Sequence, residues 1–458
     1  MTNILILIFV LGYIAIATEH SLKLDKTVPA LLTAAILWAL LAIGFHGDWF
    51  DIIDSEGHVY HFLSGGDAAN EGFHNTLMHH LGKTAEILVF LTGAMTIVEI
   101  IDLHRGFEIL KGYVKTNSRR KLLWIIGLIA FVLSAVIDNL TATIVLVTLL
   151  RKLVTDKKIR LWYVGLIVIA ANAGGAFSPI GDVTTTMLWI AKKVSAAGLI
   201  EHVAIPSILN LLVPFGIASF MPVFNGNVKS EEESKSTIKA EKLLSSSTML
   251  YLGLGMILFV PVFKTITHLP PYLGMMLSLG IVWLVSEYIH PEEDFTEERK
   301  HLYSPHKALS RIEMSSILFF LGILLAVGAL ESLVYGSING IEMGSLRYLA
   351  EVLQQTLPNT EIVVVLLGIL SAIVDNVPLV AASMGMFTYP IDHIIWHMIA
   401  YSAGTGGSIL IIGSAAGVAA MGMEKINFFW YMKNISWLAL LGFLAGFIIF
   451  WIEALLRF

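Results

Sequence analysis

The chain is built from long apolar runs separated by shorter polar segments. Apolar runs lie at 2–17, 28–45, 83–103, 203–223, 247–264, 271–289, 313–334 and 434–457. A helix needs about 20 apolar residues to span a hydrocarbon core of about 30 Å. The pattern therefore predicts an all-α polytopic membrane protein.

Basic residues orient these runs relative to the membrane. Lys and Arg occur at 18–27 and gather at 104–121 and 151–160, whereas the polar loop 46–82 has many acids and no Lys or Arg. Loops rich in Lys and Arg stay on the cytoplasmic side of a membrane. We therefore expect the basic loops inside, the loop 46–82 outside, and the N-terminus outside.

Segment 122–150 is apolar but lies between two loops that are both predicted to be cytoplasmic. Folded back on itself, it gives two helical arms of roughly 20–24 Å at about 1.5 Å per residue. Arms of this length fall short of a core of about 30 Å. The segment therefore predicts a re-entrant hairpin that enters from the cytoplasm, with Asp138 and Asn139 at its tip. Irregular backbone at that depth is tolerated where it lines a cavity within the protein.

The next run, 161–193, is interrupted in its middle. Between Asn172 and Asp182 the sequence contains three glycines and one proline. Glycine and proline in mid-span favour a discontinuous helix. Residues 225–245, which are rich in Lys, Glu and Ser, predict a cytoplasmic linker that ends the first half of the chain.

Three stretches of the first half recur in the same order in the second half. The matches are 134–141 with 371–378, 171–175 with 403–407, and 87–91 with 317–321, at offsets of 237, 232 and 230 residues. Matches in one order at nearly one offset argue for an internal duplication.

The duplication defines two halves of opposite orientation, because five crossings return the first half to the cytoplasm. We predict that 1–224 and 246–458 form an inverted-topology repeat, an architecture of transporters. The hairpin and discontinuous helix are expected at 122–150 and 161–193 in the first half, and at 361–390 and 393–424 in the second.

Composition narrows the classes of function. Hydrophobic residues make up 56% of the 458 residues and charged residues 14%, which is typical of membrane proteins. The absence of cysteine excludes disulfides, thiolate catalysis and cysteine-based metal sites. No basic stretch is dense enough to indicate a nucleic-acid partner. Residues 2–17 lack a basic flank and an obvious cleavage site, so we expect a first membrane helix rather than a removed signal.

Each predicted hairpin tip carries an Asp-Asn pair within an apolar run. A carboxylate inside a membrane is costly and indicates function. The tips and broken helices would offer carboxylate, amide, hydroxyl and carbonyl oxygens. These hard ligands suit an alkali cation better than a transition metal. Because desolvation raises the pKa of a buried carboxyl group, a proton would compete with the cation for one site.

We expect the cation and proton site to draw on both tips and both broken helices. The candidate residues are Asp138, Asn139, Thr141, Asn172, Ser178, Asp182, Thr184, Thr185, Ser371, Asp375, Asn376, Ser408 and Ser414, with Na⁺ itself at Asp138, Asn139, Asp375 and Asn376. Structural alternatives remain open for all of them. For Asp138 and Asp375 the alternative is a structural cap or a buried ion pair. For Asp182, Asn139 and Asn376 it is a helix cap, and for Asn172 and the hydroxyl residues it is packing between membrane helices.

The second copy lacks several of these polar groups. At an offset of 232 residues, Asp182 aligns with Ser414 and Asn172 aligns with Gly404. We therefore expect the first copy to bind the ion more strongly.

Five histidines crowd the predicted external loop. They are His58, His61, His74, His79 and His80. A solvated loop with pH-dependent charge is the preferred interpretation, and a metal site is the alternative.

The two Asp-Asn tips, the sequence from Asn172 to Asp182 and the Val-Thr-Thr-Thr that follows it together resemble the NhaD-type sodium/proton antiporters of the ion transporter superfamily. The likeness covers essentially the whole chain. The resemblance implies exchange of Na⁺ or Li⁺ for H⁺, without a cofactor, in a bacterial inner membrane. It also implies a homodimer with a fixed scaffold and a moving domain of hairpins and broken helices, which is elevator-type alternating access.

We therefore expect a secondary transporter rather than an enzyme, with the lipid bilayer and the ions Na⁺, Li⁺ and H⁺ as its partners. The main alternative is an anion, dicarboxylate or arsenite carrier of the same superfamily. Dicarboxylate carriers of that superfamily have Ser-Asn-Thr at their tips, and carboxylates in that place would repel an anion. A membrane-embedded hydrolase would need a catalytic signature such as an in-membrane His-Glu-x-x-His, which does not occur. The broken repeats disfavour a passive channel.

Overall fold

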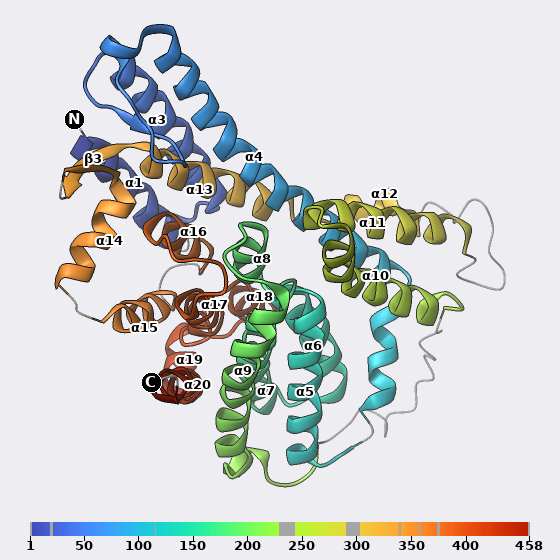
Figure 1. Ribbon diagram of the computed structural model, residues 1–458. Helices are drawn as coiled ribbons and strands as arrows, with labels where there is room; N and C mark the ends of the chain where they lie inside the picture. The colour runs from blue at the N-terminus through green and yellow to red at the C-terminus, as the bar shows by residue number, and fades with distance from the viewer. Residues whose placement is uncertain are drawn as a thin grey trace. The chain divides into compact units, whose positions relative to one another are not determined.

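The computed structural model describes residues 2–18, 22–114, 116–228, 243–289, 303–338, 340–356, 359–372 and 376–456. Helices form nearly all of its regular structure (Figure 1), as the apolar pattern predicts. Strands occur in the described residues as two antiparallel pairs. They are β1 (Ile52–Ile53) with β2 (Val59–Tyr60), and β3 (Val334–Ile338) with β4 (Ile341–Gly344).

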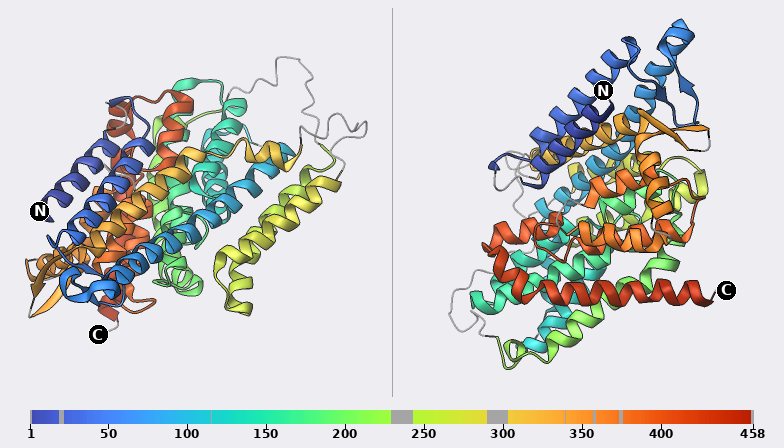
Figure 2. Two further views of the ribbon diagram at one scale, coloured as in Figure 1. Left: turned by 90° about the horizontal axis from the view of Figure 1, so that it is seen from above. Right: turned by 90° about the vertical axis from the view of Figure 1, so that its left-hand side faces the viewer.

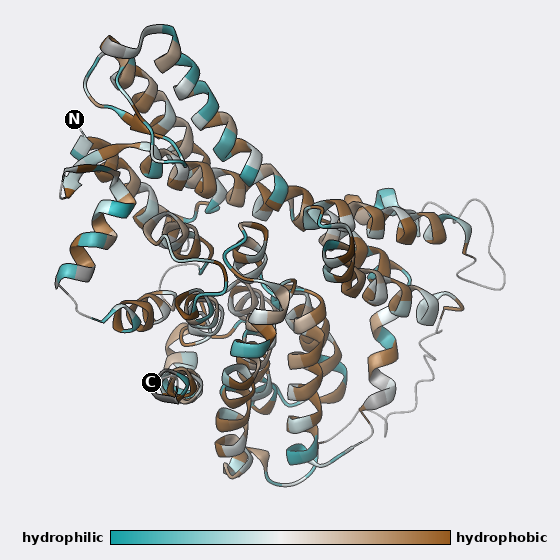
Figure 3. Ribbon diagram, viewed as in Figure 1, coloured by the Kyte–Doolittle hydropathy of each residue, from teal (hydrophilic) through white to brown (hydrophobic). Residues whose placement is uncertain are grey.

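Seven helices in the described part of the chain are long and apolar enough to cross a membrane, as a multi-pass membrane protein requires. The spans are Thr27–His46 (α3), Gly65–Leu103 within α4 (Phe62–Leu103), Lys157–Ala176 (α7), Ala196–Ser219 (α9), Ser246–Thr267 (α10), Met314–Ser332 (α13) and Ser436–Glu453 within α20 (Ser436–Leu456). Figure 3 shows that apolar residues, in brown, predominate on these helices, except in the first half of α4, where hydrophilic residues, in teal, alternate with them.

The helices are interrupted where glycine, proline and the first Asp-Asn pair predict a break. α5 (Arg119–Val136) gives way to α6 (Asn139–Leu153), α7 to α8 (Val183–Ile190), and α17 (Ile394–Gly406) to α18 (Ala415–Glu424). α15 (Thr360–Leu370) and α16 (Asn376–Met386) flank the second predicted tip. Asp375 at that tip lies outside the described residues.

The first of two compact units comprises Met1–Val89, Glu313–Leu366 and Val377–Pro390. In it α3 packs against α1 (Thr2–Ala17) and α13. Leu37, Leu41 and Phe45 of α3 bury their side chains with Ala326 and Ala329 of α13, because small residues let membrane helices approach closely. The β3–β4 pair leads into α14 (Ser345–Thr356), which packs on β3.

The second unit comprises Phe90–Ile312, Leu367–Asn376 and Ile391–Phe458. α5 packs on α7, α9 on α20, and α10 on α11 (Pro271–Tyr288) (Figure 1, Figure 2). Its shorter elements are η1 (Gly106–Tyr113), η2 (Pro222–Phe224), α12 (Pro305–Leu309) and α19 (Phe428–Asn434). Every residue of α7 from Tyr163 to Ala176 is buried, as expected for a helix that is apolar on all sides.

Both compact units draw on both predicted halves of the chain. The division into inverted repeats on either side of 225–245 stays a prediction, and residues 229–242 of that linker lie outside the described residues.

The predicted polar loop 46–82 is wrong over most of its length. α4 begins at Phe62 and runs to Leu103, with non-helical backbone angles at Gly66. In its first part, over 62–83, Ala69, Gly72 and Thr76 are buried while the other described residues are more exposed. Spacings of three and four residues are those of an amphipathic helix. Much of the segment that is predicted as a polar loop is therefore a half-buried helix, and its mixed polarity comes from one buried face and one exposed face.

Candidate functional site

The carboxylate of Asp182 closes the break between α7 and α8. Its Oδ1 accepts hydrogen bonds from the backbone N of Thr184 at 2.8 Å and from Thr184 Oγ1 at 2.7 Å. Asp182 is therefore the N-cap of α8, where an acidic oxygen satisfies free backbone N–H groups and meets the positive end of the helix. The residue is only 2% exposed.

The other carboxylate oxygen of Asp182 accepts from side-chain amides. Asn139 Nδ2 donates to Asp182 Oδ2 at 2.6 Å and to Asn172 Oδ1 at 3.0 Å. Asn376 Nδ2 lies 3.5 Å from the same Asp182 oxygen. Asn172 Nδ2 in turn donates to Ser414 Oγ at 2.9 Å.

These contacts form one buried hydrogen-bonded network within the second unit. Besides Asp182, the network contains four polar residues that are each at most 6% exposed: Asn139, Asn172, Asn376 and Ser414. Asn139 and Asn376 begin the helices after the two tips, while Asn172 and Ser414 come from the two broken helices. The network, here called the Asp182 network, therefore brings together residues from all four predicted elements.

Asp138 is the N-cap of α6 and is half-buried. Its Oδ1 accepts from the backbone N of Thr141 at 2.8 Å and its Oδ2 from Thr141 Oγ1 at 2.6 Å. Asp138 thus acts with Thr141 as a helix cap, which is the structural alternative that the sequence leaves open for Asp138.

The remaining candidate hydroxyls bond to backbone groups. Thr185 Oγ1 donates to the carbonyl oxygens of Ser178 and Asp182 at 2.6 and 2.9 Å. Ser371 Oγ donates to Ala403 O at 3.0 Å, and Ser408 Oγ donates to Thr405 O at 2.6 Å. These bonds hold the breaks in shape, while the hydroxyl oxygens keep lone pairs that are able to accept.

The contacts around the two broken helices repeat at the offsets seen in the sequence. Ser134 Oγ donates to Ala171 O at 2.6 Å, which is the counterpart of the Ser371 bond to Ala403. A side chain on Gly174 would collide with the carbonyl of Phe131, and one on Gly406 would collide with the carbonyl of Gly368. Glycine at both places lets the broken helix touch the neighbouring backbone.

The histidines of the predicted external loop do not share one partner. Nδ1 of His58 lies 3.2 Å from Asp54, and Nδ1 of His61 lies 2.9 Å from Asp51. Although burial raises the pKa of Asp54, N–H and O–H donors that include Tyr60 hold it below its ordinary value. His74, His79 and His80 lie on α4. No group of three or more His, Asp or Glu side chains able to hold a metal ion occurs among the described residues.

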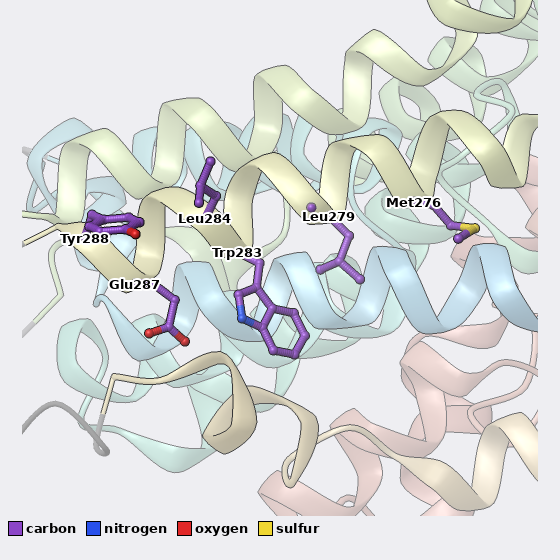
Figure 4. Close-up of a pocket in the computed structure, with 7 residues that line it drawn as sticks. Met276, Leu279, Trp283, Leu284, Glu287 and Tyr288 are labelled. Carbon is purple, nitrogen blue, oxygen red and sulfur yellow. The ribbon is translucent and has the colours of Figure 1, made fainter.

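A groove of about 540 Å³ lies along α11 (Figure 4). Leu279, Trp283 and Leu284 line it, with Glu287 as its acid. It offers mainly apolar contacts, so it does not match the oxygen-rich chemistry of the Asp182 network.

A buried ion cluster in the second unit was not predicted from the sequence. Glu424, at the end of α18, accepts from Arg151 Nε at 2.6 Å and from Arg160 Nε at 3.0 Å. The available signal was an acid that closes an otherwise apolar span, together with the basic loop 151–160.

This chain is similar to known transporters in sequence and in fold. The citrate transporter family profile matches residues 13–398. Sodium/proton antiporter 2 of Arabidopsis thaliana is 41% identical over 96% of this chain and 97% of its own length. The Na(+)/H(+) antiporter NhaD of Alkalimonas amylolytica is 31% identical over 98% of this chain and 90% of its own.

A solved structure resembles the fold. The Alcanivorax borkumensis YdaH transporter matches with a TM-score of 0.59 over 94% of this chain and 98% of its own, at 13% identity. That similarity supports the transporter fold alone. With the family match and the near full-length relatives, the chain belongs to the NhaD-type antiporters of the ion transporter superfamily.

Proposed function

We propose that this protein exchanges Na⁺ or Li⁺ for H⁺, with the Asp182 network as its ion site. One observation carries the proposal. Asp182 Oδ2 and Asn172 Oδ1 converge on the same amide nitrogen of Asn139, at 2.6 and 3.0 Å. A small cation in place of that amide would meet a carboxylate oxygen and an amide oxygen at once, which is ligand chemistry that suits a hard cation.

Exchange follows from the single negative charge of the network. The other side chains named in it are neutral amides and hydroxyls, so one Na⁺ or one H⁺ on Asp182 balances the charge. Rotation of the Asn139 amide would release the cation position and present its own oxygen to the ion. Occupation by one ion excludes the other, which couples their movements.

The proposal extends to the finer features that the sequence predicts. Asp138 and Asp375 at the tips would be further ligands or proton carriers, and the protein would work as an elevator-type homodimer in a bacterial inner membrane with its N-terminus outside. The named relatives, which are sodium/proton antiporters, support the exchange reaction.

An anion carrier is the second candidate, because the matching family profile is that of citrate transporters. The buried carboxylate of Asp182 argues against it, since an anionic substrate would be repelled there.

Proton movement in everted vesicles, recorded on addition of Na⁺, Li⁺, K⁺, citrate or arsenite, tests these candidates. A response to Na⁺ or Li⁺ supports exchange, and a response to citrate or arsenite alone refutes it.

Substitution of Asp182 locates the site. A unit charge about 4 Å away is worth about 4 kcal/mol at an effective dielectric constant near 20, or about 10³-fold in affinity. Asp182→Asn should raise the apparent KM for Na⁺ on this scale. Asp156→Asn is the matched control, because Asp156 also caps a helix, accepting from Lys158 N at 2.8 Å, but is exposed. Equal, small effects of both substitutions would reject the assignment.

A further inference from the structure

Four ionisable side chains form a chain in the second unit, away from the Asp182 network. The rings of His202 on α9 and His397 on α17 have centroids 4.6 Å apart. His397 Nε2 is 3.6 Å from Asp392 Oδ1, and His202 Nδ1 is 3.4 Å from Glu453 Oε2 on α20. These four residues are called the paired-histidine cluster.

The two histidines of the cluster are buried, and its two carboxylates are partly exposed. The His397 side chain is 0% exposed and that of His202 is 13% exposed, whereas Glu453 and Asp392 are 27% and 35% exposed. A proton is therefore able to reach the buried rings from the surface by way of either carboxylate.

Backbone contacts fix the position of Asp392. Its N donates to Lys193 O at 3.0 Å, and its Oδ1 accepts from Ser195 N at 2.7 Å. Its φ of 59° lies in the left-handed region, which Asp tolerates better than most residues. His397 thus faces a carboxylate that is held in place.

Few other charges surround the pair. The ionisable residues near the pair in sequence are Glu201 on α9, His393 at the N-cap of α17, Tyr401 on α17, and Lys192 and Lys193 before α9. The Lys193 ammonium lies 4.7 Å from the centre of the Trp396 ring. α8 has no ionisable residue, and those of α5 and α7 are confined to 119–121 and 157–163 at their N-terminal ends. Asp392 and Glu453 are carboxylates that lie within 4 Å of the ring nitrogens.

We propose that His202 and His397 share one proton, so that the paired-histidine cluster is a second H⁺-binding site. Two flanking carboxylates favour one imidazolium, whereas a second positive ring 4.6 Å from the first is opposed by like-charge repulsion. The two rings therefore hold a single proton between them.

The bound proton acts on exchange through α17. A proton on His397 strengthens its contact with Asp392, which Ser195 N holds at the start of α9, and so ties α17 to α9; a proton on His202 strengthens the contact of α9 with Glu453 of α20. Contacts to an ionised partner are stronger than neutral ones. α17 leads into the break that supplies Ser414 to the Asp182 network. Protonation therefore restrains the broken helix and slows exchange in acid. This inference rests on the proposed Na⁺/H⁺ exchange.

The test is the pH profile of the maximal exchange rate at saturating Na⁺, since competition at the ion site itself is overcome by excess Na⁺. His202→Gln and His397→Gln should each move the acid limb by about 1 pH unit to lower pH, and the double variant should move it no further. Glu453→Gln keeps both rings and should shift the limb in the same direction. His393→Gln, at the N-cap of α17 and four residues before His397, is the control and should leave the profile unchanged.

Three outcomes overturn the inference while exchange itself stands. They are single-variant profiles that coincide with that of the unmodified protein, a double variant that shifts twice as far as each single one, and a change in KM for Na⁺ without a change in maximal rate. If the unmodified protein shows no Na⁺-dependent proton movement at any pH, the proposed function fails and this inference fails with it.

Discussion

Glu424→Gln should strongly destabilise the protein, because Glu424 is a buried carboxylate held between two guanidinium groups. Its side chain is 2% exposed, and its oxygens accept from Arg151 and Arg160 at 2.6 and 3.0 Å. Arg151 also donates to the carbonyl of Met423, and Arg160 donates to Val154 O at 2.8 Å. The cluster thus joins the end of α6 and the start of α7 to the end of α18.

The size of the effect follows from burial. Removing one partner of a buried ion pair costs about 3–5 kcal/mol, because a charge is left uncompensated, whereas an exposed pair is worth about 0.2–1 kcal/mol. Arg160 is 15% exposed and belongs to the first case; Arg151 is 44% exposed and lies nearer the second. We therefore expect Glu424→Gln to lower the free energy of unfolding by about 3–4 kcal/mol.

Unfolding of the purified protein in mixed detergent micelles, driven by an increasing fraction of SDS, measures this difference. Lys152→Gln is the matched control, because its partner Glu108 lies 2.9 Å away in a pair whose side chains are 51% and 33% exposed. The control should cost less than about 1 kcal/mol. In the double variant Arg160→Gln with Glu424→Gln the loss should be smaller than the sum of the single losses. A Glu424→Gln protein as stable as Lys152→Gln would refute the argument.

Three further predictions concern transport and topology. Asp138→Asn and Asp375→Asn should each abolish or greatly weaken Na⁺-dependent proton flux at normal expression; Asn keeps the cap that Asp138 provides for α6, and unmodified exchange would show that residue to be dispensable. The apparent KM for Na⁺ should rise as pH falls, since protonation removes the charge that binds the cation; a KM that is constant from acid to alkaline pH would indicate separate routes. In this cysteine-free chain, Thr155→Cys should react with an impermeant thiol reagent only in everted vesicles, and Asn359→Cys only in right-side-out cells; labelling of Thr155→Cys from outside would make 122–150 a full crossing.

The helix breaks were predictable because their causes are local. Proline and glycine between Asn172 and Asp182 disfavour a continuous helix wherever the segment lies, and α7 ends within that stretch, at Ala176. The start of α4 was not predictable from polarity. Its first turns bury only a narrow face, at Ala69, Gly72 and Thr76, and that face is recognisable only once its packing partners are known.

Contacts between segments that are far apart in the sequence could not be predicted from the spacing of residues. Glu424 lies more than 260 residues from both of its arginines, and His202 lies 195 residues from His397. Neither pair shares a motif or a repeat offset. Only the fold brings the members of each pair together. A single sequence, read without an alignment, therefore shows no more than ionisable residues in apolar segments.

The asymmetry of the duplication explains why the Asp182 network carries one charge. Asp182 and Ser414 occupy equivalent positions, and each caps the helix after its break. Asn172 links Ser414 to the amide that binds Asp182. An aspartate in place of Ser414 would put a second carboxylate three hydrogen bonds from Asp182, where like charges raise the cost of ionising both. With serine there, a single Na⁺ or H⁺ would neutralise the network, as the proposed competition of the two ions at this site requires.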